Sequence, residues 1–319
     1  MTTPAVVWSP RYSFDWPDHV FPTSKYRLAF AALRAEGLAD ADWIEPGRIA
    51  RDDLLLVHTP RFVAEIERLT ADPARIVQRY EIPLSRGVVE AVEFHCEGTR
   101  RAVLAALERG CALNLGGGFH HAFADRGEGF CLWNDVVVAL RAARRDGRLA
   151  RAAVVDLDLH QGNGTAALLE DDADFTTYSI HQEDLYPVPK RRSALDVGLP
   201  GGSGDAEYLG ALRDTLPGFL EKGGAELLLY VAGADPFERD RLGDLKLTRA
   251  GLRARDEFVL EEARRRGMKV AAVVAGGYAP DVADVVAIHV DLWRALGRFA
   301  AARDAMPHAA RDSSRDATH

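Results

Sequence analysis

The feature of this sequence that most constrains its fold is the alternation of short apolar runs with longer amphipathic stretches. Short runs rich in β-branched side chains are typical of buried strands, and apolar residues at helical spacing are typical of helices that cover a sheet. We expect strands at Ala112–Leu115, Ala152–Leu157, Thr176–Ile180, Leu227–Ala232 and Val270–Ala275. We expect helices at Lys25–Glu36, Arg86–Arg109, Asp135–Asp146, Ala206–Lys222, Arg249–Arg266 and Ala283–Ala301. This order predicts a doubly wound α/β domain, with a mostly parallel sheet covered by helices on both faces.

The length and composition of the chain are sufficient for one large core. The sequence has 319 residues, of which 47% are apolar, and it shows no internal repeat and no linker. We therefore expect a single domain over residues 1–302. Residues 303–319 are polar and rich in alanine, aspartate and serine, so we expect a disordered C-terminal tail there.

The charge and the cysteine content narrow the class of protein. The formal net charge of −8 argues against direct nucleic-acid binding, because proteins that bind DNA are usually basic. Three cysteines without a C-x-x-C pair argue against a disulfide framework and favour a reducing compartment. The apolar run Ala5–Trp8 is too short for a signal-peptide core, and no apolar run is long enough to predict a membrane span. We expect a cytoplasmic protein.

Four of the predicted strands run directly into polar or glycine-rich clusters. These clusters are Gly116–His121, Asp156–His160, Gly233–Asp235 and Gly276–Tyr278. In open α/β sheets, ligands bind beyond the carboxyl ends of the strands. We therefore expect the four clusters to converge at one edge of the sheet.

The acidic clusters have the side chains that a divalent cation prefers. Asp156, Asp158 and His160 are spaced two apart, so they would lie on one side of the chain if the strand stayed regular throughout. Asp235 adds a carboxylate at the end of another strand, and carboxylates with an imidazole suit zinc. The alternative is that these acids cap the elements that follow; Asp235 by itself would be an ordinary helix cap.

The remaining two clusters carry groups that can move protons. His120 and His121 are adjacent in a glycine-rich loop, and Tyr278 follows two glycines. An isolated histidine or a tyrosine in a turn is more often structural, but their combination with the acidic clusters predicts a metal hydrolase. In such a site the histidines transfer protons and the tyrosine donates to an oxyanion. Cys131 has no evident base beside it, so a cysteine nucleophile is not expected.

Five motifs in this order resemble the histone deacetylase family over about residues 21–296. The motifs are Gly116–His121, Gly129–Asp135, Asp156–Gly164, Gly233–Asp235 with Arg241–Gly243, and Gly276–Tyr278. The stretch His160–Gly164 is most similar to the class IV branch and related bacterial proteins. In the class I branch the same stretch usually reads His-His-Gly-Asp-Gly.

The resemblance implies an arginase–deacetylase α/β fold and two kinds of metal site. One zinc ion per chain is implied at Asp158, His160 and Asp235. A structural potassium ion is also implied. Main-chain oxygens of Asp156, Asp158 and His160 would hold it, with Ser179 and Ile180 of the next strand nearby.

The resemblance also implies the roles of the groups around the zinc ion. His120 and His121 are implied as the proton-transfer pair, with Asp156 as the partner of His120 and Asn163 as the partner of His121. Tyr278 completes the catalytic set.

Gly129, Phe130 and Tyr186 are implied as the walls of a substrate tunnel. The expected reaction is removal of acyl groups, acetyl or longer, from the side-chain amine of an acyl-lysine protein or peptide. An acetylpolyamine amidohydrolase acting on an acylated small amine is the alternative enzyme. An arginase-like enzyme is less expected, because Asn163 departs from the two-metal ligand pattern. A catalytically inactive ligand-binding protein is the alternative outside enzymes.

Overall fold

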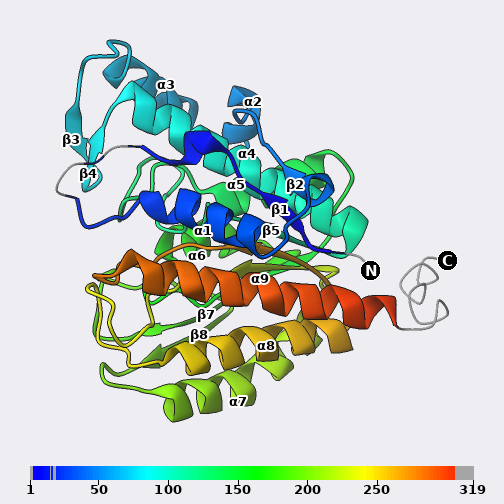
Figure 1. Ribbon diagram of the computed structural model, residues 1–319. Coiled ribbons are helices and arrows are strands. Elements are labelled where there is room, and N and C mark those ends of the chain that lie inside the picture. The colour runs from blue at the N-terminus through cyan, green and yellow to red at the C-terminus, as the bar shows by residue number, and fades with distance from the viewer. Residues whose placement is uncertain (1–2, 15, 17–18, 306–319) are drawn as a thin grey trace.

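An eight-stranded parallel sheet forms the centre of the computed structural model, which describes residues 3–305 except 15, 17 and 18 (Figure 1). In sheet order the strands are β2 (Trp43–Ile44), β1 (Ala5–Val7), β5 (Cys111–Asn114), β10 (Lys269–Val273), β9 (Leu227–Val231), β6 (Ala152–Asp156), β7 (Phe175–Gln182) and β8 (Leu195–Leu199). A separate antiparallel pair consists of β3 (Val77–Arg79) and β4 (Ile82–Leu84).

The α-helices form two groups that cover the sheet. In the first, α1 (Ser24–Ala35), α9 (Val282–Asp304), α8 (Arg249–Arg265) and α7 (Asp205–Gly223) pack in that order, and Figure 1 shows them as one stack in front of the sheet. The second group comprises α4 (Arg86–Arg109), α5 (Asp135–Arg145) and α6 (Asn163–Leu169). The shorter α2 (Arg51–Leu54) and α3 (Pro60–Leu69) lie between β2 and β3 in the chain.

The doubly wound parallel architecture predicted from the sequence is confirmed. Each predicted strand and helix occurs with bounds close to those expected, and α4 has the expected bounds. Its ends follow from its sequence, because the Ser85 hydroxyl caps Val88 N at 3.3 Å and Gly110 adopts a φ of 96° beyond the last turn. The strands β1, β2 and β8 were not predicted, because they are short or partly exposed.

The C-terminal boundary differs slightly from the expectation. Helix α9 continues to Asp304, and the Arg303 guanidinium donates to the carbonyl oxygen of Met268 at 2.8 Å. This contact fixes the last turn against the loop before β10. Residues 306–319 of the predicted tail lie outside the described residues. None of the helices in the described part of the chain is long and apolar enough to cross a membrane.

The four polar clusters lie at one edge of the sheet, as predicted. The strands that precede them, β5, β10, β9 and β6, are consecutive neighbours in the sheet, and all run in parallel. Parallel neighbours end at the same edge, so the loops after these strands meet there.

A fully buried arginine ties two of these loops together. Arg255 of α8 has no exposed surface, and its Nη1 donates to the carbonyl oxygens of Leu157 at 3.1 Å and Gly233 at 2.8 Å. Its charge is balanced by Asp256, 2.9 Å away. Because Leu157 follows β6 and Gly233 follows β9, Arg255 joins the ends of these two strands.

The buried arginine generates a prediction about stability. Arg255→Met should lower the free energy of unfolding by about 3–5 kcal/mol, because it leaves a buried carboxylate without its partner. The measurement is urea unfolding followed by circular dichroism. Arg253→Met, at an exposed position of the same helix, is the matched control and should change stability by less than about 0.5 kcal/mol. Equal losses in the two variants would contradict the structural role of Arg255.

Candidate active site

The loop after β5 is held in place by a buried aspartate. Asp135, the first residue of α5, accepts hydrogen bonds from the main-chain N–H groups of Gly118 at 2.9 Å and Phe119 at 2.7 Å. Gly118 has a φ of +78°, and a Cβ there would lie 2.5 Å from the Cβ of Ala275. Glycine at this position therefore lets the β5 and β10 loops touch. The same loop carries His120 and His121.

The two adjacent histidines have different partners. His120 Nδ1 lies 2.7 Å from Asp156 Oδ2, and His121 Nδ1 lies 2.7 Å from Asn163 Oδ1. Both imidazoles are buried. The structure therefore pairs one histidine with a carboxylate and the other with an uncharged amide.

The pKa values of the two histidines shift in opposite directions. Burial opposes the charged form of His120, but the carboxylates of Asp156 and Asp158 outweigh it and raise the pKa of His120 to about 9. Burial and the charges of His120 and His160 lower the pKa of His121 well below its usual value. A cation bound nearby would lower the pKa values of both histidines. The difference between the two pKa values would still reflect their partners, a carboxylate for His120 and an amide for His121.

Asp158, His160 and Asp235 form a buried group whose ligand atoms all lie within 4.8 Å of one another. His160 Nδ1 is 3.4 Å from Asp158 Oδ1 and 3.5 Å from Asp235 Oδ2. Ligands of a tetrahedral zinc ion are roughly 3.3–3.6 Å apart, given zinc–ligand distances of about 2.0–2.2 Å. These three side chains therefore fit a zinc ion.

Asp235 gives a second reason to place a cation here. Its Oδ1 accepts a hydrogen bond from Leu159 N at 3.0 Å, whereas its buried Oδ2 has no hydrogen-bond partner in the described part of the chain. Burial and the neighbouring Asp158 raise the pKa of Asp235 to about 7. A buried carboxylate with an unsatisfied oxygen beside a second carboxylate is costly, and a divalent cation would offset that cost.

Asp156 does not join this group, although its spacing would place it there in a regular strand. Strand β6 ends at Asp156, and the chain then turns, so the alternation of side chains is lost before Asp158 and His160. The Asp156 carboxylate bonds instead to His120 and to the main-chain N–H of Asp158 at 3.1 Å.

Tyr278 lies where two cavities meet. The inner cavity has a volume of about 20 Å³ and is lined by Phe21, the Gly117–His121 loop and Ala275, among others. The outer cavity, of about 230 Å³, opens toward Tyr186 and Leu242. The residues that border both are His121, Gly129, Phe130, His160 and Tyr278. Burial and the charges of Asp235 and Asp158 raise the pKa of Tyr278 well above 10, so its hydroxyl keeps its proton.

The implied tunnel residues line the outer cavity. Gly129 and Phe130 both have positive φ angles, 55° and 67°, and a Cβ on Gly129 would lie 2.6 Å from the His121 ring. The Tyr186 ring centroid is 5.1 Å from that of His121, and the Phe130 centroid is 6.2 Å from that of Tyr278. The walls of the cavity are therefore in contact with the two groups that we expect to react.

The residues implied for potassium lie on neighbouring strands. Ser179 of β7 is in register with Asp156 of β6, and Ile180 follows it. The Ser179 hydroxyl is 2.9 Å from His181 Nδ1. The potassium site stays a prediction.

Lys25 supports the site but was not predicted from the sequence patterns. It lies on α1 with no exposed surface, and its ammonium group donates to the carbonyl oxygen of Ala275 at 2.7 Å. It also lies 5.6 Å from the Tyr278 ring centroid. Burial lowers the pKa of Lys25 to about 8. A lysine on an amphipathic helix normally reaches solvent, so its sequence context gave no signal.

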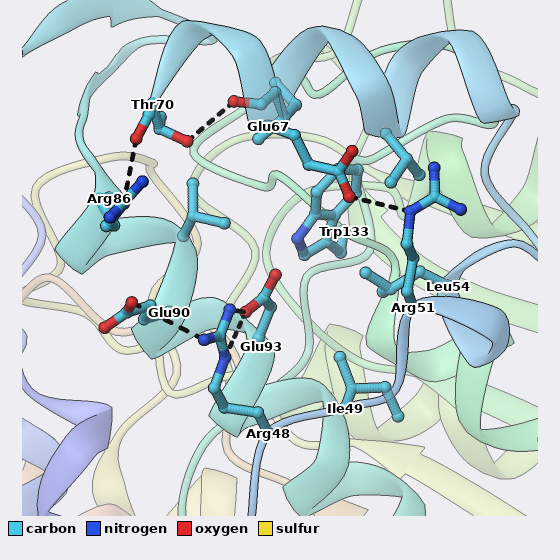
Figure 2. A pocket seen from close by; sticks show the side chains of 13 residues that line it. Arg48, Ile49, Arg51, Leu54, Glu67, Thr70, Arg86, Glu90, Glu93 and Trp133 are labelled. Carbon is cyan, nitrogen blue, oxygen red and sulfur yellow. Dashed lines mark hydrogen bonds and ion pairs between the residues drawn. The ribbon is translucent and has the colours of Figure 1, made fainter. Parts of the chain in front are cut away.

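A larger cavity of about 400 Å³ lies away from these residues (Figure 2). The charged residues of its wall are Arg48, Arg51, Arg86, Glu67, Glu90 and Glu93. They interact with one another or with the main chain: Arg51 Nε donates to Glu67 Oε1 at 2.9 Å, and Arg86 Nε to Thr70 O at 3.2 Å. Its wall has no histidine, cysteine or tyrosine, so we place the chemistry at the sheet edge instead.

Solved structures share the fold of this chain. A histone deacetylase homologue from Aquifex aeolicus matches with a TM-score of 0.80 and 23% identity, covering 93% of this chain and 84% of its own. An acetylpolyamine aminohydrolase from Burkholderia pseudomallei matches with a TM-score of 0.78 and 20% identity, covering 93% and 99%.

Sequence comparison establishes the family. Histone deacetylase 2 of Arabidopsis thaliana is 31% identical over 301 residues, which cover 90% of this chain and 78% of the plant protein. A model of the histone deacetylase domain matches residues 19–292, the region that contains all four polar clusters. Because the domain match and the sequence identity both extend over most of the chain, this protein belongs to the histone deacetylase family of hydrolases.

Proposed function

We propose that this protein is a zinc-dependent amidohydrolase that removes acetyl and other short acyl groups from the side-chain amine of acylated lysine in a protein or peptide. One observation carries the proposal. His121, Tyr278 and His160 all border both the narrow inner and the wider outer cavity, and His160 belongs to the buried metal-ligand group with Asp158 and Asp235. This combination supplies every group that amide hydrolysis needs.

Asp158, His160 and Asp235 would hold the zinc ion, which when bound supplies a Lewis acid that polarises the amide carbonyl and acidifies a water molecule. His121, neutral beside Asn163, accepts a proton from the water that attacks the carbonyl carbon. Tyr278 donates a hydrogen bond to the carbonyl oxygen as negative charge develops on it.

The leaving amine requires a proton before it can depart. His120 lies beside the Asp156 carboxylate, which stabilises its charged form, so we assign it the role of proton donor to the amine nitrogen. The carbon–nitrogen bond then breaks to give a carboxylate and a free amine. The two histidines thus divide proton acceptance and donation according to their partners.

The two cavities match the two parts of an acyl-lysine side chain. The outer cavity, with Phe130 and Tyr186 in its walls, suits the apolar alkyl chain of lysine. The inner cavity of about 20 Å³ has room for one or two water-sized groups. We therefore assign the acyl group to the inner cavity and expect a preference for short acyl groups.

An acetylated polyamine is the alternative substrate. Glu81 lies in the wall of the outer cavity, and a carboxylate there would attract the additional ammonium groups of a polyamine. Comparing kcat/KM for an acetylated polyamine and an acetyl-lysine peptide decides between the two substrates. A higher value for the polyamine would favour the alternative.

The proposed zinc site generates a prediction about metal content. Asp235→Ala should remove most of the bound zinc and the activity together, because it deletes one of three protein ligands. Elemental analysis of the purified protein measures the zinc-to-chain ratio. Asp244→Ala is the matched control, since Asp244 is an exposed carboxylate in the same β9–α8 connection. Full zinc occupancy in Asp235→Ala would remove Asp235 from the ligand set.

The proposed hydroxyl donor is tested by Tyr278→Phe. We expect kcat to fall by roughly a hundredfold or more with zinc content unchanged, because the lost hydrogen bond acts mainly on the developing oxyanion. Tyr178→Phe, which removes a hydroxyl bonded to Thr215, is the control and should leave kcat near that of the unmodified protein. Near-normal kcat in Tyr278→Phe would assign the oxyanion contact to another group.

The size of the inner cavity is tested with lysine peptides that carry acyl chains of graded length. We expect kcat/KM for the acetyl peptide to exceed that for a hexanoyl peptide by at least about tenfold, because each extra methylene must displace packed side chains. Equal or higher kcat/KM for the hexanoyl peptide would show that the acyl group does not occupy the inner cavity seen here.

A further inference from the structure

A carboxylate at the rim of the site bonds to the partner of His121. Glu128 Oε1 accepts a hydrogen bond from Asn163 Nδ2 at 2.7 Å and from the Tyr186 hydroxyl at 3.2 Å. Its Oε2 accepts from Arg126 Nε at 3.3 Å. The Glu128 side chain is about one quarter exposed, with a relative accessibility of 26%.

The backbone holds Glu128 in this position. The N–H of Glu128 donates to the carbonyl oxygen of Cys131 at 3.0 Å, and the N–H of Cys131 donates back to Glu128 at 2.9 Å. Gly129 and Phe130, which line the outer cavity, form the turn between them. The carboxylate therefore belongs to the same tight turn as the cavity wall.

The polarity of these hydrogen bonds determines how the Asn163 amide is oriented. An ionised carboxylate can only accept, so the NH₂ group of Asn163 must face Glu128. Its Oδ1 must then face His121 Nδ1, and because a carbonyl oxygen only accepts, that nitrogen must carry the proton. This leaves the lone pair of His121 on Nε2, at the ring edge that can act as a base.

A reversed amide would have the opposite effect. Asn163 Nδ2 would then donate to His121 Nδ1, the proton would move to Nε2, and the base would be lost. The main-chain N–H of Gly164 donates to Asn163 Oδ1 at 3.0 Å and opposes this reversal, so Glu128 shares the task. Its loss should therefore weaken catalysis without abolishing it.

We propose that Glu128 is a positioning residue, whose carboxylate fixes the Asn163 amide and thereby the reactive tautomer of His121, while also holding Tyr186 in the outer wall. This inference rests on the proposed function, because it takes His121 as the proton acceptor. The catalytic contact itself belongs to His121. Glu128 acts through Asn163.

An exchange of the carboxylate and the amide tests the proposal. In Glu128→Gln the new amide at position 128 and the Asn163 amide can reverse together. The tautomer of His121 that is protonated on Nδ1 is then no longer enforced. In the double variant Glu128→Gln with Asn163→Asp, the carboxylate at position 163 can only accept, both from the amide at 128 and from His121 Nδ1. The polarity that selects the reactive tautomer is then restored.

We expect kcat of Glu128→Gln to fall by about tenfold, a part of what a general base contributes, with a smaller change in KM. The double variant should recover kcat to within about threefold of the unmodified protein. Each kcat is measured with an acetyl-lysine peptide on the pH plateau of that variant, with zinc content checked. A role in stability alone predicts that the double variant is no better than Glu128→Gln.

Asp125→Asn is the matched control, because Asp125 is an exposed carboxylate of the same loop that also contacts Arg126. Asp125→Asn should leave kcat unchanged, both in the unmodified protein and when combined with Glu128→Gln. The proposal is overturned if the unmodified protein is active but Glu128→Gln retains full kcat, or if the exchange gives no recovery. Absence of acyl hydrolysis by the zinc-loaded unmodified protein would instead overturn the proposed function.

Discussion

The structure depends on the crowding of two buried carboxylates, Asp158 and Asp235, around His160. All three residues are at most 8% exposed, and one oxygen of Asp235 has no hydrogen-bond partner among the described residues. Two neighbouring buried negative charges are strongly unfavourable, and a bound divalent cation would offset much of that cost. The fold must therefore bring several strand ends to one point and hold them there against this repulsion.

The surrounding elements meet that requirement through contacts with the main chain. Gly276 N donates to Asp158 Oδ2 at 2.9 Å, and a Cβ on Gly276 would lie only 2.1 Å from Asp235. Arg255 joins the loops after β6 and β9, and Lys25 bonds the loop after β10. Arg255 and Lys25 are buried cations, and Gly276 has no side chain. None of the three adds negative charge beside the carboxylates, so the carboxylates can approach closely.

Local sequence patterns predicted the parts of the fold and of the candidate site that are local in the chain. The strands β5, β6, β9 and β10 and the clusters that follow them are continuous segments, so periodicity and topology were sufficient. The contribution of Lys25 depends on Ala275, 250 residues away, and Glu128 meets Asn163 across 35 residues. No local pattern encodes such contacts. Alternation would group Asp156 with Asp158 and His160 only in a regular strand, and that strand β6 ends at Asp156 is visible only in the backbone.

In the proposed reaction, water activated between His121 and the metal-ligand group hydrolyses the amide of an acylated amine. The most direct test is to incubate the zinc-loaded protein with an acetyl-lysine peptide in water enriched in oxygen-18 and to analyse both products by mass spectrometry. We expect free lysine peptide together with acetate that has gained one labelled oxygen per turnover. Failure to release acetate, or release of acetate without the label, would rule out the proposed reaction.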